Sequence, residues 1–314
     1  MNGLELSRSY FERYARPMLE RDFPELLPYL AAGFTGSGSE HYGYDDESSR
    51  DHDFEPGFCL FLPGEEIIDR RQEFRLERAY AKLPKEYMGF TRQRLSPVGG
   101  NRHGVMRTAE FYQKAIGSAD GVLSVDQWLH IPDYALAEAV NGEIFFDGFG
   151  EVSRIREALK TMPEDVRLKR LAGNLLIMAQ AGQYNFARCL GHGEPEAAQL
   201  ACHEFVSAAM KAAFLLRGQY MPYYKWSFRA LRELEGTGAL AGKLSILLHE
   251  DCREETGART MLDTIEEICA GYIAELTKNG LSEAVCADLE KHAYSVNDRI
   301  RDGSIRNLHI LTAV

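Results

Sequence analysis

Residues 36–53 read GSGSEHYGYDDESSRDHD, a glycine–serine turn followed by two aspartates, Asp51 and Asp53. Successive side chains of an extended chain point to opposite faces, so both carboxylates would emerge on one face and His52 on the other. Two adjacent carboxylates suit a magnesium or manganese ion that also binds triphosphate oxygens. The pattern predicts a metal–nucleotide site in which Asp51 and Asp53 are both metal ligands and catalytic residues. His52 is interpreted as a packed or hydrogen-bonded support residue.

The turn in front of these aspartates, formed by Gly36, Ser37, Gly38 and Ser39, predicts a phosphate-binding loop. Glycine permits backbone conformations in which successive N–H groups point into one concave nest, and such nests bind anions. The two serine hydroxyls add further donors. We therefore expect this turn to orient the phosphates of a nucleotide.

A solvated acidic loop is the alternative interpretation of this region, because Asp45, Asp46, Glu47 and Glu55 crowd around the aspartate pair. The glycine spacing and the apolar run at residues 58–62, which predicts a strand directly after the acids, favour the functional interpretation.

Composition restricts the class of protein. The chain has 314 residues, 45% hydrophobic content and a formal net charge of −11, enough for a substantial core in one or two domains. The negative charge argues against binding of extended nucleic acid, which requires clustered basic side chains. The N-terminus lacks the pattern of a signal peptide, and no stretch is long and apolar enough to span a membrane. We expect a cytoplasmic protein without membrane partners.

The cysteine pattern gives little evidence of a metal site. Six cysteines are scattered without a Cys-x-x-Cys pair, which is typical of reduced thiols in a cytosolic protein. Cys189, His192, Cys202 and His203 fit no closed four-ligand zinc pattern.

Periodicity and turn residues predict an α+β protein in two domains, residues 1–151 and 152–314. In the first, a mixed sheet has flanking helices: strands are predicted at residues 31–35, 51–62, 88–95, 104–108 and 142–146, and helices at 5–20, 65–82, 109–116 and 124–141. The second is predicted to be an all-helical bundle, with helices at residues 153–182, 196–217, 225–236, 238–249, 259–279 and 281–300 and a break at 161–165.

The Gly-Ser turn, Gly43 and the segment Ser49-Arg50-Asp51-His52-Asp53 resemble the motif of the nucleotidyltransferase superfamily, which includes DNA polymerase β and the aminoglycoside nucleotidyltransferases. Together with residues 16–19, 23–24, 142–147 and 220–226, nearly the whole chain resembles a bacterial family known mainly as a domain of unknown function. The resemblance implies a nucleotidyltransferase-like first half and a helical second half, but no substrate.

The segment Tyr220-Met221-Pro222-Tyr223-Tyr224-Lys225-Trp226 places Lys225 near the start of a helix. In the antibiotic nucleotidyltransferases that the chain resembles, a lysine of the helical domain approaches the nucleotide phosphates, which implies this role for Lys225 and a cleft that the helical domain closes. An aromatic turn with a solvent-facing lysine fits the segment equally well.

One expected acid is missing. The resembling families commonly have a third carboxylate on the strand predicted at 104–108, where this chain has Met106 and Arg107. Glu110, Asp126 and Asp147 are the available substitutes, and Asp147 fits a turn or helix cap equally well.

Two hypotheses follow. The first is a magnesium-dependent nucleotidyltransferase, with ATP as the expected donor and an unidentified hydroxyl on a small molecule or protein as acceptor. The second is a catalytically degenerate relative that binds a nucleotide or a partner. The intact turn and aspartate pair favour the first, and the missing strand carboxylate favours the second.

Overall fold

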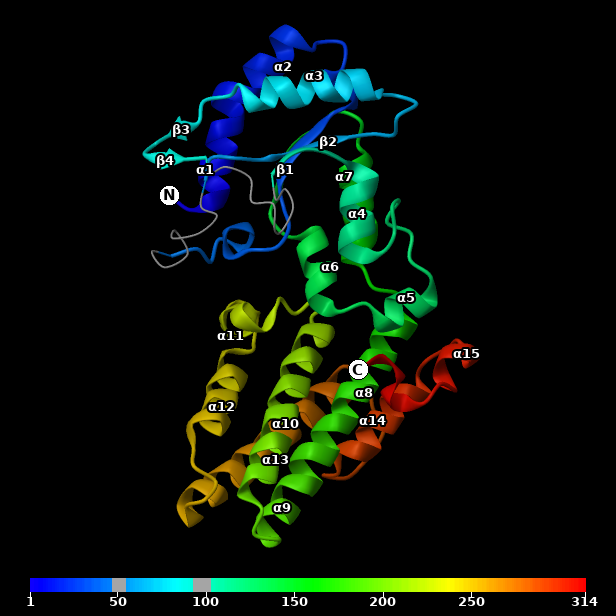
Figure 1. The fold of residues 1–314 in the computed structure, drawn as a ribbon. Coiled ribbons are helices and arrows are strands. Elements are labelled where there is room, and N and C mark those ends of the chain that lie inside the picture. The colour runs from blue at the N-terminus through cyan, green and yellow to red at the C-terminus, as the bar shows by residue number, and fades with distance from the viewer. Residues whose placement is uncertain (47–54, 93–102) are drawn as a thin grey trace. The chain divides into compact units, whose positions relative to one another are not determined.

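The structure, a computed structural model, describes residues 1–46, 55–92 and 103–314. Its internal contacts divide the chain into two compact units (Figure 1). The first, unit 1, comprises Met1–Leu123 and Ala135–Thr161, and the second, unit 2, comprises Ser124–Tyr134 and Met162–Val314. Residues 124–134 belong to unit 2, although unit 1 continues after them. The domains predicted at residues 1–151 and 152–314 stay a prediction.

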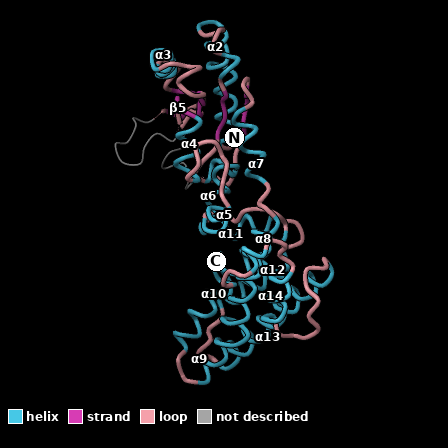
Figure 2. Tube along the Cα trace, turned by 90° about the vertical axis from the view of Figure 1, so that its right-hand side faces the viewer, coloured by secondary structure: helices cyan, strands magenta, loops and turns pink. Residues whose placement is uncertain are grey.

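Unit 1 contains the described strands (Figure 2). Its elements are α1 (Gly3–Tyr10), η1 (Phe11–Ala15), α2 (Arg16–Asp22), η2 (Leu27–Tyr29), β1 (Ala31–Phe34), η3 (Ser39–Tyr42), β2 (Cys59–Leu62), α3 (Arg70–Ala81), β3 (Glu86–Tyr87), β4 (Phe90–Thr91), β5 (Gly104–Arg107), α4 (Thr108–Ile116), β6 (Glu143–Asp147) and α7 (Glu151–Lys160).

The main sheet of unit 1 has the strand order β5-β2-β1-β6. β1 is antiparallel to β2 and β6, whereas β2 is parallel to β5. The mixed sheet predicted for the first half is therefore confirmed.

Both faces of the central strands β1 and β2 are buried. On one face, Leu60 and Leu62 of β2 belong to a core cluster with Phe11 of η1 and Leu76 of α3. On the other face, Cys59 and Phe61 pack with Val152 of α7. This alternation follows from the two-residue period of a strand.

A bulge interrupts the pairing of β1 with β6 between Ala32 and Gly33. A side chain at Gly33 would lie 2.7 Å from the carbonyl oxygen of Glu143, so glycine is required for this close approach.

Three predicted elements of unit 1 are corrected. The strand predicted at 51–62 is formed only by Cys59–Leu62 among its described residues, because Pro56 and Gly57 precede it. The described part of the strand predicted at 88–95, residues 88–92, instead belongs to the hairpin β3–β4, which turns at Met88 and Gly89, both with positive φ. The helix predicted at 65–82 begins only at Arg70, where Asp69 accepts a hydrogen bond from the backbone N–H of Gln72.

The helix predicted at 124–141 is two helices, α5 (Val125–His130) in unit 2 and α6 (Asp133–Val140), which begins in unit 2 and ends in unit 1. Pro132 separates them, because the residue before a proline avoids the helical conformation.

The regular elements of unit 2 are all helices among its described residues, which confirms the predicted helical second half (Figure 2). With α5 it contains α8 (Glu164–Met178), η5 (Ala179–Phe186), α9 (Ala187–Gly191), α10 (Pro195–Leu216), α11 (Tyr224–Glu233), α12 (Gly238–His249), α13 (Glu255–Lys278), α14 (Leu289–Asp298), α15 (Gly303–Arg306) and η6 (Ile310–Ala313). α8 is buried along most of its length and packs against α10 and α14, as expected for a helix that is apolar on most sides. Within the described residues, every helix is too short or too polar to cross a bilayer.

Candidate functional site

One end of the sheet in unit 1 brings the predicted turn together with the starts of three strands. β1 ends there at Phe34, and the register pairs Phe34 with Glu143 and Gly33 with Cys59, which in turn pairs with Gly104. We call this the turn end of the sheet. Because β1 runs opposite to its neighbours, Thr35 and Gly36 emerge where β2, β5 and β6 begin.

The turn is held by two side chains from later in the chain. The amide of Asn141 accepts from the N–H of Gly36 (3.0 Å) and donates to the carbonyl of Gly36 (2.8 Å). The buried guanidinium of Arg156, on α7, donates to Thr35 Oγ1 (3.2 Å) and to the carbonyl of Val140 (2.8 Å). These hydrogen bonds hold the backbone in place where the chain leaves β1 and enters the turn.

Two glycines of the turn have positive φ. Gly36 and Gly38 have φ of 132° and 127°, values at which other residues are strained. The N–H of Gly36 is occupied by Asn141, but the N–H groups of Ser37, Gly38 and Ser39 make no hydrogen bond with any described residue. Ser37 is exposed, whereas Ser39 is buried and donates to a carboxylate oxygen of Glu40 (3.4 Å). Binding of nucleotide by Gly36–Ser39 stays a prediction, with Ser37 as the more available hydroxyl.

Two buried histidines lie beside the turn. The ring of His41 stacks on Phe34 with centroids 4.3 Å apart, and the ring of His103 stacks on Phe34 at 5.0 Å. The buried carboxylate of Glu40 lies 3.5 Å from His41 Nδ1. Sequence reasoning missed these residues, although Glu40 and His41 directly follow the turn.

The aspartate pair Asp51 and Asp53, with His52, lies outside the described residues. In the described ranges, no group of three or more histidine, cysteine, aspartate or glutamate side chains is placed to hold a metal ion. The assignment of Asp51 and Asp53 as metal ligands stays a prediction.

The substitutes for the third carboxylate are placed by the sheet register. Asp147 pairs with Ala31, at the end of the sheet opposite Gly36, and its oxygens accept from the N–H groups of Gly150 and Ser153, both at 2.7 Å. It serves as a cap of α7. Glu110, on the first turn of α4, follows the end of β5 opposite Gly36 and is exposed.

Asp126, the third substitute, is an exposed residue of α5 in unit 2. Sequence reasoning did not consider Glu143, the acid on β6 at the turn end. Its carboxylate accepts from Arg8 Nε at 3.0 Å.

Lys225 is exposed at the start of α11 in unit 2, with Nζ 5.3 Å from the ring centroid of Trp226. Two exposed rings precede it: Tyr223 and Tyr224 have centroids 4.5 Å apart, and Tyr134 contacts Tyr223 edge-on at 5.8 Å. The predicted helix start is confirmed, while a phosphate-binding role for Lys225 stays a prediction.

Unit 2 also contains a buried ion pair that the sequence did not reveal. Asp133 Oδ1 lies 3.0 Å from an Arg170 guanidinium nitrogen, and both side chains are less than a tenth exposed. Burial raises the pKa of the Asp133 carboxyl above its usual range, although the nearby Arg170 and Lys211 act to lower it.

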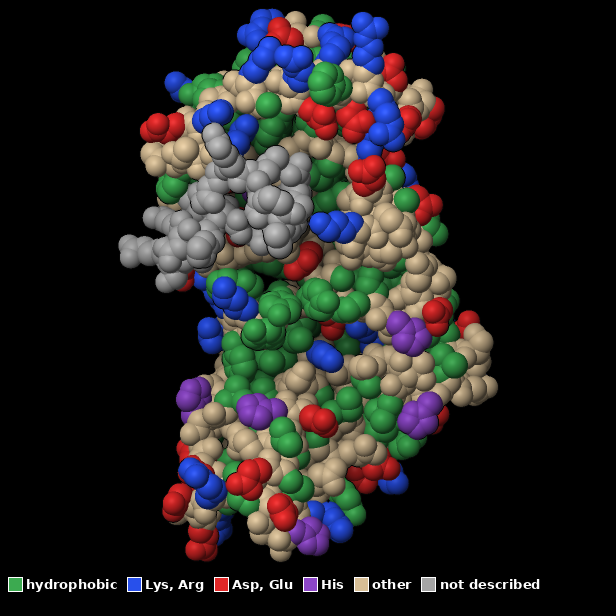
Figure 3. Space-filling view, viewed as in Figure 1, with side chains coloured by type: hydrophobic (Ala, Val, Ile, Leu, Met, Phe, Trp, Pro, Cys, Tyr) green, Lys and Arg blue, Asp and Glu red, His purple; other side chains and the backbone are tan. Residues whose placement is uncertain are grey.

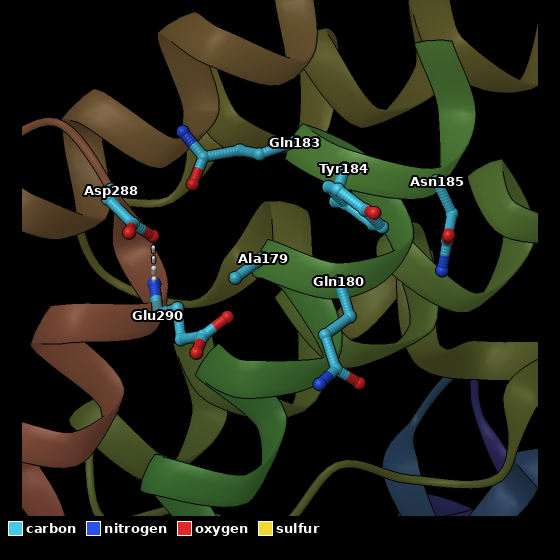
Figure 4. Close-up of a pocket in the computed structure, with 7 residues that line it drawn as sticks. All are labelled: Ala179, Gln180, Gln183, Tyr184, Asn185, Asp288 and Glu290. Atoms are coloured by element: carbon cyan, nitrogen blue, oxygen red, sulfur yellow. Dashed lines mark hydrogen bonds between the residues drawn. The ribbon is translucent and has the colours of Figure 1, made fainter. Parts of the chain in front are cut away.

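A hollow of about 510 Å³ opens in unit 2 beside the π-helical segment η5 (Figure 4). Gln183, one of its lining residues, accepts from the N–H of Leu289 (2.9 Å) and donates to Glu266 (2.8 Å) and to the carbonyl of Ala287. Asp288 accepts from the N–H of Glu290. Because these polar groups already join η5 to the start of α14, we interpret their role as structural.

Residues 128–227 match the family model described as "Domain of unknown function (DUF4037)". This match confirms the resemblance to a domain of unknown function and covers both Asp133 and Lys225. Among solved structures, the chain is similar to the crystal structure of a nucleotidyltransferase-like protein from Exiguobacterium sibiricum 255-15, with a TM-score of 0.37 and 12% sequence identity over 85% of this chain and 78% of that one. No curated protein matches the sequence.

Proposed function

We propose that the protein is a magnesium-dependent nucleotidyltransferase that transfers AMP from ATP to a hydroxyl group and releases pyrophosphate. The supporting observation is the turn: the N–H groups of Ser37, Gly38 and Ser39 are not used by described residues, and the turn precedes Asp51-x-Asp53 in the sequence. Asp51 and Asp53 would hold a magnesium or manganese ion, which would offset negative charge on the triphosphate.

In the proposed reaction, an acceptor oxygen attacks the α-phosphorus of ATP. A new P–O bond forms to the acceptor, the bond to the bridging oxygen of the β-phosphate breaks, and the acceptor proton leaves to solvent or a base. Such an in-line displacement depends mainly on positioning and on stabilisation of charge. The rigid turn would contribute the positioning, since Asn141 and Arg156 fix the segment that leads into it.

A catalytically degenerate nucleotide-binding protein is the second candidate. The observation that favours it is Arg107 of β5, which occupies the strand where the resembling families commonly have an acid. Its guanidinium bonds the carbonyls of Pro63 and Ile68 and the carboxylate of Glu73, so it is a structural group.

Incubation with labelled ATP, GTP, CTP or UTP, magnesium or manganese and a pool of hydroxylated metabolites distinguishes the two candidates. The enzyme hypothesis predicts acceptor-dependent release of pyrophosphate, which Asp51→Asn and Asp53→Asn abolish. Saturable nucleotide binding without pyrophosphate release would favour the degenerate relative.

Gly36→Val is expected to weaken ATP binding at least tenfold, whereas Ser39→Ala should change it by less than about fivefold. Valine at φ 132° strains the backbone by roughly 1–3 kcal/mol and would displace the N–H groups that follow it. The added side chain meets no atom within 4 Å, so the effect would come from backbone conformation. Gly193→Val, also at a positive φ with open space but in unit 2, is the matched control. Calorimetric titration measures the affinities, and normal ATP binding by a folded Gly36→Val protein would contradict the placement.

A further inference from the structure

A basic groove of about 680 Å³ lies between α2 and α3 of unit 1. Five basic side chains line it, with Asp22 as the single acid among the lining residues: Arg13, Arg21, Arg75, Arg78 and Lys82. The groove thus carries a net charge of about +4 in a chain whose net charge is −11. Figure 3 shows Lys and Arg side chains gathered over α2 and α3.

Most of these cations form no ion pair in the part of the chain that the structure describes. Arg21 pairs with Asp22 at 2.7 Å, but Arg13, Arg75, Arg78 and Lys82 form no ion pair with any described acid. Close like charges repel one another, so this arrangement costs folding energy that a bound anion would offset.

The guanidinium groups are held by aromatic rings and by helix geometry. Arg75 lies over the ring of Phe23 at 5.2 Å, and Arg13 over the ring of Tyr14 at 5.7 Å. Arg75, Arg78 and Lys82 recur at a spacing of three and four residues, which places them on one face of α3. Arginine held in this way presents a planar fork of donors that matches phosphate oxygens.

The groove is remote from the turn. Residues 3–22 form one continuous helical rod, and Gly3 lies against Glu40, which follows the turn. At 1.5 Å per residue, Arg13 is about 15 Å and Arg21 about 27 Å along the rod from Gly3. A triphosphate bound at the turn would not reach the groove.

We propose that this groove binds a small molecule carrying two or more phosphate groups, at a site separate from the turn. The volume lies in the range of small-molecule sites. Buried Met18, Phe23 and Leu83 give the groove an apolar floor beneath its basic rim, which suits an anion attached to a compact organic body. The strongly negative net charge of the whole chain disfavours an extended polyanion, because such a ligand would reach beyond the groove onto negatively charged surface.

Calorimetric titration of the full chain with inorganic tripolyphosphate, without divalent metal, tests this proposal. We expect saturable binding that weakens with added salt and falls at least tenfold in Arg75→Gln/Arg78→Gln. The same loss is expected in Arg13→Gln/Lys82→Gln, which removes two groove charges from different elements. Arg70→Gln/Arg71→Gln is the matched control, because it removes two charges of α3 that do not line the groove, and it should bind normally.

The Gly36→Val protein separates this proposal from the proposed function. It should bind tripolyphosphate at the groove with wild-type affinity even if ATP binding at the turn is lost. Equal affinities in the groove variants and the control, or no saturable binding by the wild type, would overturn the proposal. Tighter Arg75-dependent binding of a short single-stranded RNA than of tripolyphosphate would overturn it in favour of a nucleic-acid surface.

Discussion

Replacing Arg107 with methionine is expected to lower the free energy of unfolding by about 3–5 kcal/mol. The buried guanidinium donates to the carbonyls of Pro63 (2.6 Å) and Ile68 (2.8 Å) and to the carboxylate of Glu73 (2.6 Å). Methionine fills much of the same volume but donates nothing, so two carbonyls and a largely buried carboxylate lose their partner. These bonds join β5 to the loop before α3 and to α3 itself, and their loss should destabilise unit 1.

Urea denaturation followed by circular dichroism measures this effect. Arg70→Met is the control, because Arg70 is exposed and its ion pair with Glu65 is exposed too, so the loss of this pair should change stability by less than about 1 kcal/mol. If Arg107→Met lowers the free energy of unfolding no more than Arg70→Met does, the buried contacts of Arg107 do not stabilise the fold.

Asp133→Ala is expected to destabilise the protein by a similar amount, about 3–5 kcal/mol, because it removes the oxygen atoms beside the buried Arg170 guanidinium, which Asp133 provides whether or not it is protonated. The double variant Asp133→Ala/Arg170→Met should recover much of that loss, since removing both charges also removes the cost of burying them. Thermal and urea denaturation of Asp133→Ala, Arg170→Met and the double variant, each compared with wild type, decide this. A double variant as unstable as the sum of the single changes would contradict the pairing.

The pH dependence of this pair has a definite sign. Because burial raises the folded-state pKa of Asp133, its contribution to stability is fully present below the unfolded pKa and is lost as pH rises through the raised value. Wild type should therefore gain stability relative to Asp133→Asn, which cannot titrate, as pH falls from about 7 to about 4. A stability difference that is constant over this range would contradict the raised pKa.

The sequence was sufficient to predict the elements with strong local signals. The apolar run that ends at Phe34 and the glycines after it define β1 and the turn, and the apolar stripes of the second half define its helices. The split at Pro132 had a local signal too, but the periodicity continues across it and suggests one helix.

The long-range polar pairs could not be predicted in this way. Arg107 and Glu73 are 34 residues apart, and Asp133 and Arg170 come from different helices. Nothing local distinguishes a buried arginine from an exposed one, because its partner is set by tertiary packing. The groove between α2 and α3 has the same origin: the local sequence suggests that Arg13 and Arg75 are surface charges, and only the packing of the helices brings them together to line one groove.

The proposed function requires Asp51 and Asp53 to hold the divalent ion of an ATP site. Calorimetric titration with ATP in the presence and absence of magnesium tests it most directly, using wild type, Asp51→Asn/Asp53→Asn and the control Asp263→Asn/Asp298→Asn, which makes the same charge change at two exposed positions of unit 2. We predict that magnesium strengthens ATP binding by wild type and control. In the presence of magnesium, the Asp51→Asn/Asp53→Asn protein should be folded but bind ATP at least tenfold more weakly than wild type. Equal magnesium-dependent affinities in all three proteins would contradict the claim.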